Sequence, residues 1–196
     1  GGQGTVYKVA EQNTSEAEYA LKFLHKQKDS ERRKRMHYEV QNVSRLDSIH
    51  LMRIVESNAD RYGDETVKLY YIADFIEGIS LEKYVESHDT DFDTALNFFV
   101  ELLNVLYYCH SNNIIHRDIK PDNILFEKEN ETYTLFLTDF GTCFLKDGSE
   151  RITPEIMAIG PRMFIAPEYE VGRVENVDEK GDIFSIGKVI WCMING

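Results

Sequence analysis

The sequence predicts an α+β fold in two parts, a smaller β-rich part with one helix over residues 1–75 and a mainly helical part over residues 76–196. The first observation is that the spacing of apolar residues along the sequence changes. Up to about Phe75 the apolar residues alternate in short segments, as in strands, and after Gly78 they recur at helical spacing. The second is composition, because 196 residues with 42% hydrophobic and 29% charged side chains can bury a core and are neither disordered nor fibrous.

The first part is expected to contain four strands and one helix. The strands, which alternate or are rich in β-branched and aromatic residues, are predicted at residues 5–9, 18–23, 54–59 and 66–75. The polar residues 11–15 and 60–64 form the connections within the two strand pairs. The helix is predicted over residues 30–46, where one apolar stripe contains Met36, Val40, Val43 and Leu46. The hinge between the parts is expected at Asp74 to Gly78.

The second part is expected to contain three helices, at residues 81–87, 93–112 and 182–194. The hydroxyl of Ser80 can cap the first of them. The second is apolar around much of its circumference, so we expect it to be buried, with its inward side formed by Leu96, Phe99, Val100, Leu103 and Leu106. Short strands are predicted at residues 124–126 and 135–137 around a polar turn, and residues 141–165 are expected to be irregular.

Charge and cysteine content exclude several classes of protein. With 34 acidic and 22 basic residues the net charge is -12, which argues against nucleic acid and anionic membranes as partners of this segment. Apolar runs such as residues 189–194 are much shorter than the roughly 20 residues that cross a bilayer. Cys109, Cys143 and Cys192 are widely spaced and form no C-x-x-C pair, so a reducing, cytoplasmic location is expected.

Two features of the first part are compatible with phosphate binding. Glycines in Gly1-Gly2-Gln3-Gly4 would let the backbone approach a polyphosphate, although glycines at a hairpin also serve simple turns. Lys22 shares a strand face with Ala20, and Val6 lies on the neighbouring predicted strand. A small apolar residue beside a lysine suits a purine next to a phosphate, but a lysine here could also be a surface residue.

The strongest chemical signal is the run His116-Arg117-Asp118-Ile119-Lys120-Pro121-Asp122-Asn123. Held near a hydroxyl, Asp118 can accept its proton, and Lys120 can neutralise charge on a phosphoryl group in transfer. The amide oxygen of Asn123 can ligate Mg²⁺, and Asp139 in Asp139-Phe140-Gly141 supplies a second oxygen ligand. These residue types together indicate a phosphoryl-transfer centre.

With these motifs in this order, the chain resembles the catalytic domain of eukaryotic-type protein kinases, of the serine/threonine type. Ala166-Pro167-Glu168 and Asp182 continue the resemblance, which covers essentially the whole chain. It implies a bilobal fold with a small antiparallel β lobe, ATP and Mg²⁺ as cofactors, and transfer of the γ-phosphoryl group to a Ser or Thr hydroxyl of a protein substrate. It also implies that the chain is incomplete at both ends, without the first strand of the N-lobe and the last helices of the C-lobe.

The resemblance assigns a role to each motif residue. Lys22 is expected to hold the α- and β-phosphates and to pair with Glu39. Asp118 would be the catalytic base and Lys120 a phosphate stabiliser, while Asp182 would brace the catalytic loop from below. Asn123 and Asp139 would bind the metal. The residues expected around the nucleotide are Gly1, Gly2, Gly4, Val6, Ala20, Lys22, Glu39, Ala73, Asp74, Ile76, Asn123 and Asp139.

The chain departs from the family pattern at three positions. Pro161 stands where serine/threonine kinases usually have the threonine that bridges Lys120 and Asp118, which puts acceptor positioning in question. Met157 occupies the usual phosphoacceptor position, so activation would depend on Thr153 or need no loop phosphate. Ala73 is smaller than the usual residue and predicts an apolar recess behind the adenine.

Two alternatives come from other functional classes. A catalytically inactive kinase-like scaffold usually lacks the lysine, the catalytic aspartate or the metal aspartate, and all three are present as Lys22, Asp118 and Asp139. A small-molecule phosphotransferase usually lacks the Ala-Pro-Glu segment and the Lys120 pattern. An active protein kinase is therefore the favoured interpretation, and the sequence identifies neither its substrate nor its regulatory partners.

Overall fold

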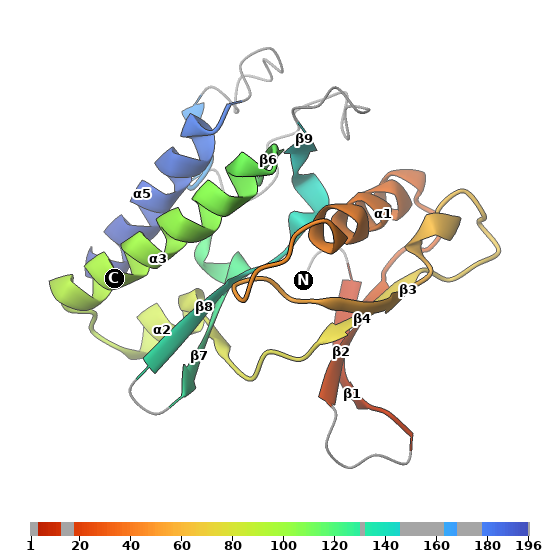
Figure 1. Cartoon of the computed structure of the whole chain (residues 1–196), viewed down its shortest axis with the longest axis horizontal. Coiled ribbons are helices and arrows are strands. Elements are labelled where there is room, and N and C mark those ends of the chain that lie inside the picture. The colour runs from red at the N-terminus through yellow and green to blue at the C-terminus, as the bar shows by residue number, and fades with distance from the viewer. Residues whose placement is uncertain (1–3, 13–17, 130–131, 146–162, 168–177, 196) are drawn as a thin grey trace.

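The computed structural model describes residues 4–12, 18–129, 132–145, 163–167 and 178–195 (Figure 1). Its first part is a four-stranded sheet with the antiparallel order β1-β2-β4-β3 and one long helix, α1 (Ser30–Ser44). The short 3-10 helix η1 (Ala59–Arg61) follows the third strand. The strands are β1 (Gly4–Ala10), β2 (Glu18–Leu24), β3 (Ile54–Ser57) and β4 (Tyr70–Asp74).

The register of the sheet gathers site residues on one face. Lys22 on β2 pairs with Val6 on β1 and with Tyr71 on β4, and Ala20 pairs with Ala73. Residues that pair across strands, and residues two apart along a strand, point to the same side of a sheet. These five side chains therefore share one face. Part of that face merges with the core of the first part, formed by Leu24, Met36, Ala59, Leu69, Tyr71 and Ala73.

Helix α1 is tied to the loops around it by a buried arginine. Asp29 caps its first turn by accepting the Arg32 N–H at 3.2 Å. One turn further, Arg33 is 1% exposed and its guanidinium donates to five backbone carbonyls at 2.6–3.0 Å. The acceptors are the carbonyl oxygens of Gln27, Arg61, Tyr62, Asp64 and Val67. All five N–H groups of the side chain are thus satisfied without a carboxylate.

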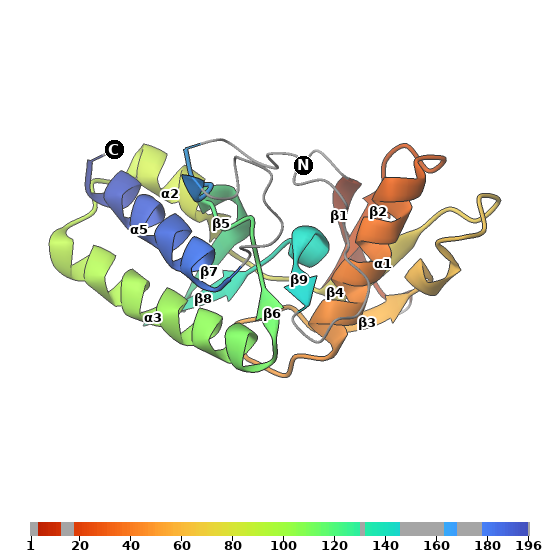
Figure 2. The ribbon, with the colours of Figure 1, turned by 90° about the horizontal axis from the view of Figure 1, so that it is seen from above.

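In its described residues, the second part contains the helices α2 (Leu81–Ser87), α3 (Phe92–Ser111) and α5 (Lys180–Asn195). Helices α3 and α5 lie side by side (Figure 2). The hairpin of β7 (Ile124–Glu129) and β8 (Thr132–Leu137) is joined by β5 (Ile79–Ser80). The remaining short elements are β6 (Ile114–Ile115), η2 (Pro121–Asn123), η3 (Phe140–Thr142) and β9 (Phe144–Leu145), with β6 paired to β9.

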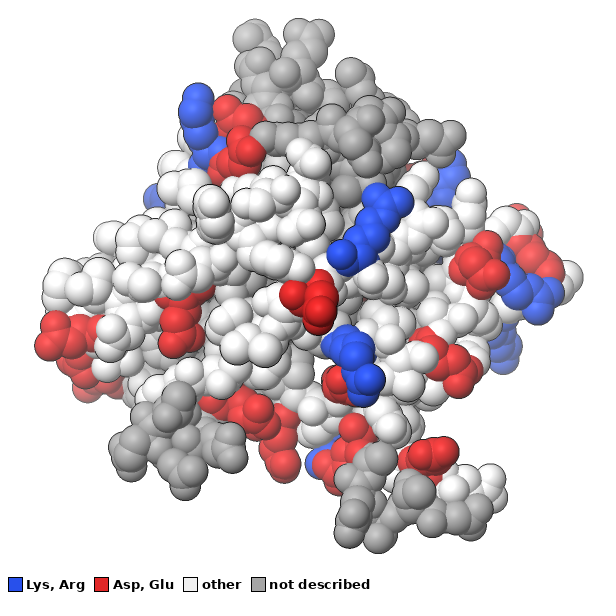
Figure 3. Space-filling model, viewed as in Figure 1, with Lys and Arg blue, Asp and Glu red and all other residues white. Residues whose placement is uncertain are grey.

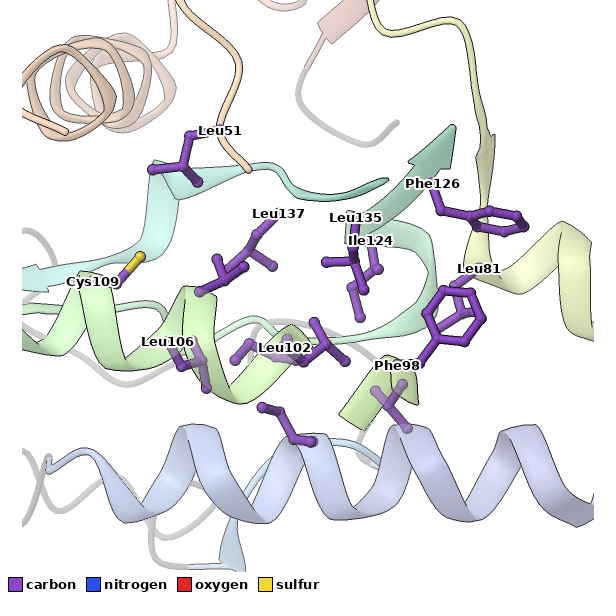
Figure 4. Packing of buried hydrophobic residues seen from close by; sticks show 14 of the residues in the cluster. Leu51, Leu81, Phe98, Leu102, Leu106, Cys109, Ile124, Phe126, Leu135 and Leu137 are labelled. Carbon is purple, nitrogen blue, oxygen red and sulfur yellow. The ribbon is translucent and has the colours of Figure 1, made fainter. Parts of the chain in front are cut away.

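The main core lies between α3, α5 and the β7–β8 hairpin. Figure 4 shows Leu102 and Leu106 of α3 on the side that faces Ile124, Leu135 and Leu137. All five are at most 1% exposed. At about 25 cal/mol per Å² of apolar surface removed from water, such side chains supply most of the driving force for folding this part.

The predicted inward side of α3 is wrong in part. Its buried residues are Ala95, Phe98, Leu102, Val105, Leu106 and Cys109. Of the residues expected to point inward, Leu106 is buried and Phe99 and Leu103 are partly buried, whereas Leu96 and Val100 are 46% and 49% exposed. The helix has apolar residues on more than one side, so the spacing alone could not select the row that packs.

Most other element predictions lie close to the observed bounds. The strand expected at residues 54–59 ends at Ser57, and the one expected at 66–75 begins only at Tyr70. Strands β7 and β8 are longer than expected, because the polar residues 127–129 continue the ladder. The two-residue strands β5, β6 and β9 carry too few residues to show a period.

The connection between the two parts is anchored at Gly78. Its N–H donates to the carbonyl oxygen of Ile76 at 3.0 Å. A Cβ atom at this position would lie 2.3 Å from the carbonyl oxygen of Phe126 on β7, far inside contact distance. Only glycine lets the connection approach β7 this closely.

On the face shown in Figure 3, the basic side chains do not gather into one region. Acidic side chains are distributed over that face, and the basic ones visible there stand apart from one another. Among the described residues, no helix has the length and apolar character needed to span a membrane.

Candidate active site

A cavity of about 250 Å³ lies between the sheet of the first part and the β7–β8 region of the second. It is lined by residues from both parts, which places side chains far apart in the sequence around one space. They are Gly4, Val6, Ala20, Lys22, Glu39, Met52, Tyr71, Asp74, Phe75, Ile76, Asn123, Leu125, Thr138 and Asp139.

Nine of the residues expected around a nucleotide line this cavity, and among the described residues only Ala73 does not. Ala73 has no exposed surface and belongs to the core of the first part, and the lining residue from its face of β4 is Tyr71. The apolar recess predicted behind Ala73 is therefore not part of the cavity. Gly1 and Gly2 lie outside the described residues, as do Thr153, Met157 and Pro161.

Five lining residues were not predicted from the sequence: Met52, Tyr71, Phe75, Leu125 and Thr138. A signal existed for some of them. Tyr71 lies two residues before Ala73 and therefore on the same strand face, Leu125 follows Asn123 by two, and Thr138 directly precedes Asp139. The residue type gave no such signal, because apolar and aromatic side chains on strands equally predict core packing.

Lys22 and Glu39 form an ion pair at the rear of the cavity. The Lys22 Nζ lies 2.6 Å from Glu39 Oε1 and 2.8 Å from Oε2, and Glu39 is 1% exposed. Tyr71 donates its hydroxyl to Glu39 Oε1 at 2.8 Å. Burial raises the pKa of Glu39, against the lowering effect of Lys22. The pKa of Lys22 is well above its usual value despite burial, because Glu39 and other negative groups favour its charged form.

Asp139 completes the charged end of the cavity. Its Oδ1 lies 3.7 Å from Lys22 Nζ, is shielded from solvent and has no hydrogen-bond partner among the described residues. Burial acts to raise the pKa of Asp139, but the charges of Lys22, His116 and Lys120 outweigh it and the pKa lies below its usual value. The residue has a φ of 63°, a left-handed conformation that is uncommon outside glycine.

Asp118 and Lys120 lie in contact on the loop before η2. The Lys120 Nζ donates to Asp118 Oδ2 at 2.8 Å, and Asn123 Nδ2 donates to the same oxygen at 2.9 Å and to the Asp118 carbonyl at 2.8 Å. Burial raises the pKa of Asp118, and the hydrogen bond and charge of Lys120 offset this only in part. Neither Asp118 nor Lys120 lines the cavity itself, but Asn123 joins them to it.

Asp182 of α5 holds the backbone of the loop that carries Asp118 through hydrogen bonds. It is fully buried, and its two carboxylate oxygens accept the backbone N–H groups of His116 and Arg117, each at 2.8 Å. His110 Nε2 lies 2.8 Å from Asp182 Oδ2. Arg117 has a φ of 68°, so the carboxylate stabilises a strained turn just before Asp118.

The donor set fits a hard divalent cation. Within the described part of the chain, no group donates a hydrogen bond to Asp139 Oδ1. The amide nitrogen of Asn123 is engaged by Asp118, which leaves the amide oxygen as the atom that could bind a metal. Both atoms belong to residues that line the same cavity. Carboxylate and amide oxygens are the ligands that suit Mg²⁺.

Comparisons with known proteins agree with this geometry. The model of a family described as "Protein kinase domain" matches residues 1–196. The chain is 29% identical over 202 residues to the serine/threonine-protein kinase PrkC of Bacillus subtilis, covering 100% of this chain and 29% of that protein. It is 29% identical to calcium-dependent protein kinase 4 of Plasmodium berghei, covering 91% of this chain and 33% of the relative. Calcium-dependent protein kinase 5 of Plasmodium falciparum is 28% identical, with 100% and 32% covered. The chain thus spans about a third of the length of these relatives.

Proposed function

Because this chain belongs to the protein kinase domain family, we propose that the protein transfers the γ-phosphoryl group of ATP to a serine or threonine hydroxyl of a protein substrate. The observation that carries the proposal is one cavity lined by the Lys22–Glu39 ion pair and by Asn123 and Asp139. The Asp118–Lys120 pair is joined to this cavity through the hydrogen bonds of Asn123. The similarity to the serine/threonine-protein kinase PrkC supports the choice of acceptor.

In this proposal each pair has one task. Lys22, fixed by Glu39, binds the α- and β-phosphates of ATP. Asn123 and Asp139 hold Mg²⁺, which when bound neutralises phosphate charge. Asp118 accepts the proton of the acceptor hydroxyl, and its raised pKa brings it closer to the working pH, where a general base is most effective. Lys120 lies 2.8 Å from Asp118 and stabilises negative charge on the phosphoryl group in transfer.

The test is phosphate transfer from labelled ATP to a generic protein substrate by the full-length protein. We expect Asp118→Asn to reduce transfer at least 100-fold, because general-base catalysis contributes about 10²–10⁴-fold. Asp93→Asn is the matched control, since Asp93 is an exposed carboxylate in the first turn of α3 and does not line the cavity. Equal transfer by the wild type and Asp118→Asn would refute the assigned base. No transfer by either would favour an inactive scaffold, and phosphotyrosine as the only product would refute the choice of acceptor.

A further inference from the structure

Tyr71 is buried against the ion pair that is expected to hold the ATP phosphates. It is 3% exposed, and its hydroxyl donates to Glu39 Oε1 at 2.8 Å. The same oxygen accepts from Lys22 Nζ at 2.6 Å, and the other oxygen accepts from Lys22 at 2.8 Å. Glu39 therefore receives donors from two different strands of the sheet.

The strand register explains how Tyr71 reaches this position. Tyr71 pairs directly with Lys22 across β2 and β4, so the two side chains leave the sheet on the same face. The Lys22 Nζ lies 5.5 Å from the centre of the Tyr71 ring, a cation–π distance. The next residue on this face of β4 is Ala73, whose methyl group takes up little of the space beside the ring. Lys22 is thus held between the carboxylate of Glu39 and an aromatic ring.

A buried carboxylate needs hydrogen-bond donors to offset its loss of hydration. Glu39 is 1% exposed and lies on α1, whereas Lys22 and Tyr71 lie on the sheet. If Lys22 turns toward the phosphates of a nucleotide, the Tyr71 hydroxyl remains a donor to Glu39. The tyrosine thus keeps α1 docked on the sheet independently of where the ammonium group points.

We propose that Tyr71 is a positioning residue that holds Glu39 in place for Lys22 and so prepares the cavity for the phosphates of ATP. The proposal rests on the proposed function and deepens it, because it adds a third member to the Lys22–Glu39 pair. A tyrosine that served only to fill the core would act through its ring. A positioning tyrosine acts through its hydroxyl and only while Glu39 is present.

The experiment is a double-mutant cycle on MgATP affinity in the full-length protein, using a fluorescent ATP analogue as probe. The variants are Tyr71→Phe, Glu39→Ala and the double variant, because Tyr71→Phe removes only the hydroxyl. Tyr70→Phe is the matched control, since the Tyr70 hydroxyl, next to it in sequence, bonds the exposed carboxylate of Glu56. We expect Tyr71→Phe to weaken binding roughly tenfold, the order of one buried hydrogen bond to a charged group. In the Glu39→Ala background it should have no further effect.

Steady-state kinetics provide the second measurement, because a lost phosphate-positioning contact should raise KM for ATP more than it lowers kcat. Wild-type affinity in Tyr71→Phe, or an equal loss with and without Glu39, would overturn the proposal. A Tyr71→Phe protein that does not fold would overturn it too, since the hydroxyl would then serve stability. If the cycle shows the expected coupling but the wild type transfers no phosphate, the proposed function fails and the assignment of Tyr71 to nucleotide binding stands.

Discussion

The carboxyl group of Asp118 must be ionised before it can accept a proton, and its surroundings act on it in opposite directions. Burial raises its pKa above the usual value, and the hydrogen bond and charge of Lys120 lower it, with burial the larger effect. A raised carboxyl pKa means that the active, ionised form is lost at a higher pH than for an exposed aspartate. Lys120 therefore extends to lower pH the range in which Asp118 is ionised.

From this balance we expect kcat/KM to rise with pH through the pKa of Asp118 and then to level off. In Lys120→Met the rise should move to higher pH by about one unit, because a contacting opposite charge typically lowers a carboxyl pKa by about 1–3 units. Lys83→Met, an exposed lysine on α2, is the control and should leave the profile in place. A Lys120→Met profile that is lower in height but unmoved would contradict the argument.

Motif residues and supporting residues differ in how well the sequence predicts them. Asp118, Asn123 and Asp139 could be singled out because few other roles explain those residue types in that order. Tyr71 could not, since an aromatic residue on a strand predicts core packing. Its role depends on the pairing of β2 with β4 and on the packing of α1, which brings Glu39 within reach of its hydroxyl. The contacts that orient a site come from pairings between segments, which local sequence does not contain.

At the scale of elements, the position of α1 depends on Arg33 as well as on Glu39. The guanidinium connects the helix to the turn before it and to the loop between β3 and β4 through backbone carbonyls alone. A basic run at the start of a helix normally predicts a solvated face. The burial of Arg33 was not predictable, because its acceptors are carbonyl groups that any residue could supply.

We expect Arg33→Met to lower the free energy of unfolding by about 3 kcal/mol, since five buried carbonyls lose their donor. Arg33→Lys should restore little of the lost free energy of unfolding. An ammonium group has only three donors and cannot reach five carbonyl oxygens that are arranged around a planar guanidinium. Lys34→Met, the exposed neighbour, should be within about 0.5 kcal/mol of the wild type. Denaturant unfolding of the three variants measures this, and a wild-type midpoint for Arg33→Met would contradict it.

Helix α3 shows the limit of periodicity as a guide to packing. Its bounds were predicted to within about a residue, but Leu96 and Val100 were placed on the wrong side. The helix could be located because apolar residues recur along it. Its rotation could not, because Phe92, Leu96, Val100 and Tyr107 form a second apolar row that is exposed. Choosing between two apolar rows requires the partners, here the β7–β8 hairpin and α5.

At the scale of the whole molecule, the cysteines report on the integrity of the main core. Cys109 on α3 and Cys143 after η3 are free thiols with no exposed surface, whereas Cys192 on α5 is partly exposed. Burial and the nearby charge of Asp182 raise the pKa of Cys109 to about 12. Burial likewise raises the pKa of Cys143 well above its usual value. At pH 8 only roughly one Cys109 thiol in ten thousand is a thiolate, the reactive form.

We therefore expect iodoacetamide to modify Cys192 first in the native protein, with Cys109 and Cys143 protected by at least 100-fold relative to the same residues in urea. Peptide mapping by mass spectrometry separates the three sites. Protection of Cys109 and Cys143 should disappear together as the core unfolds. Fast native modification of Cys143 alone would show instead that the segment after η3 opens by itself.

The close approach of Gly78 to β7 has a mechanical consequence. Gly78 lies directly against the Phe126 carbonyl on β7. The connection between the two parts is therefore packed onto the second part from Gly78 onward. Along the chain, residues 75–77 are the backbone between the end of β4 at Asp74 and this close contact at Gly78. Phe75 and Ile76 in that stretch also line the cavity. A ligand that contacts Phe75 and Ile76 would therefore also restrict the stretch of backbone that joins the sheet to the second part.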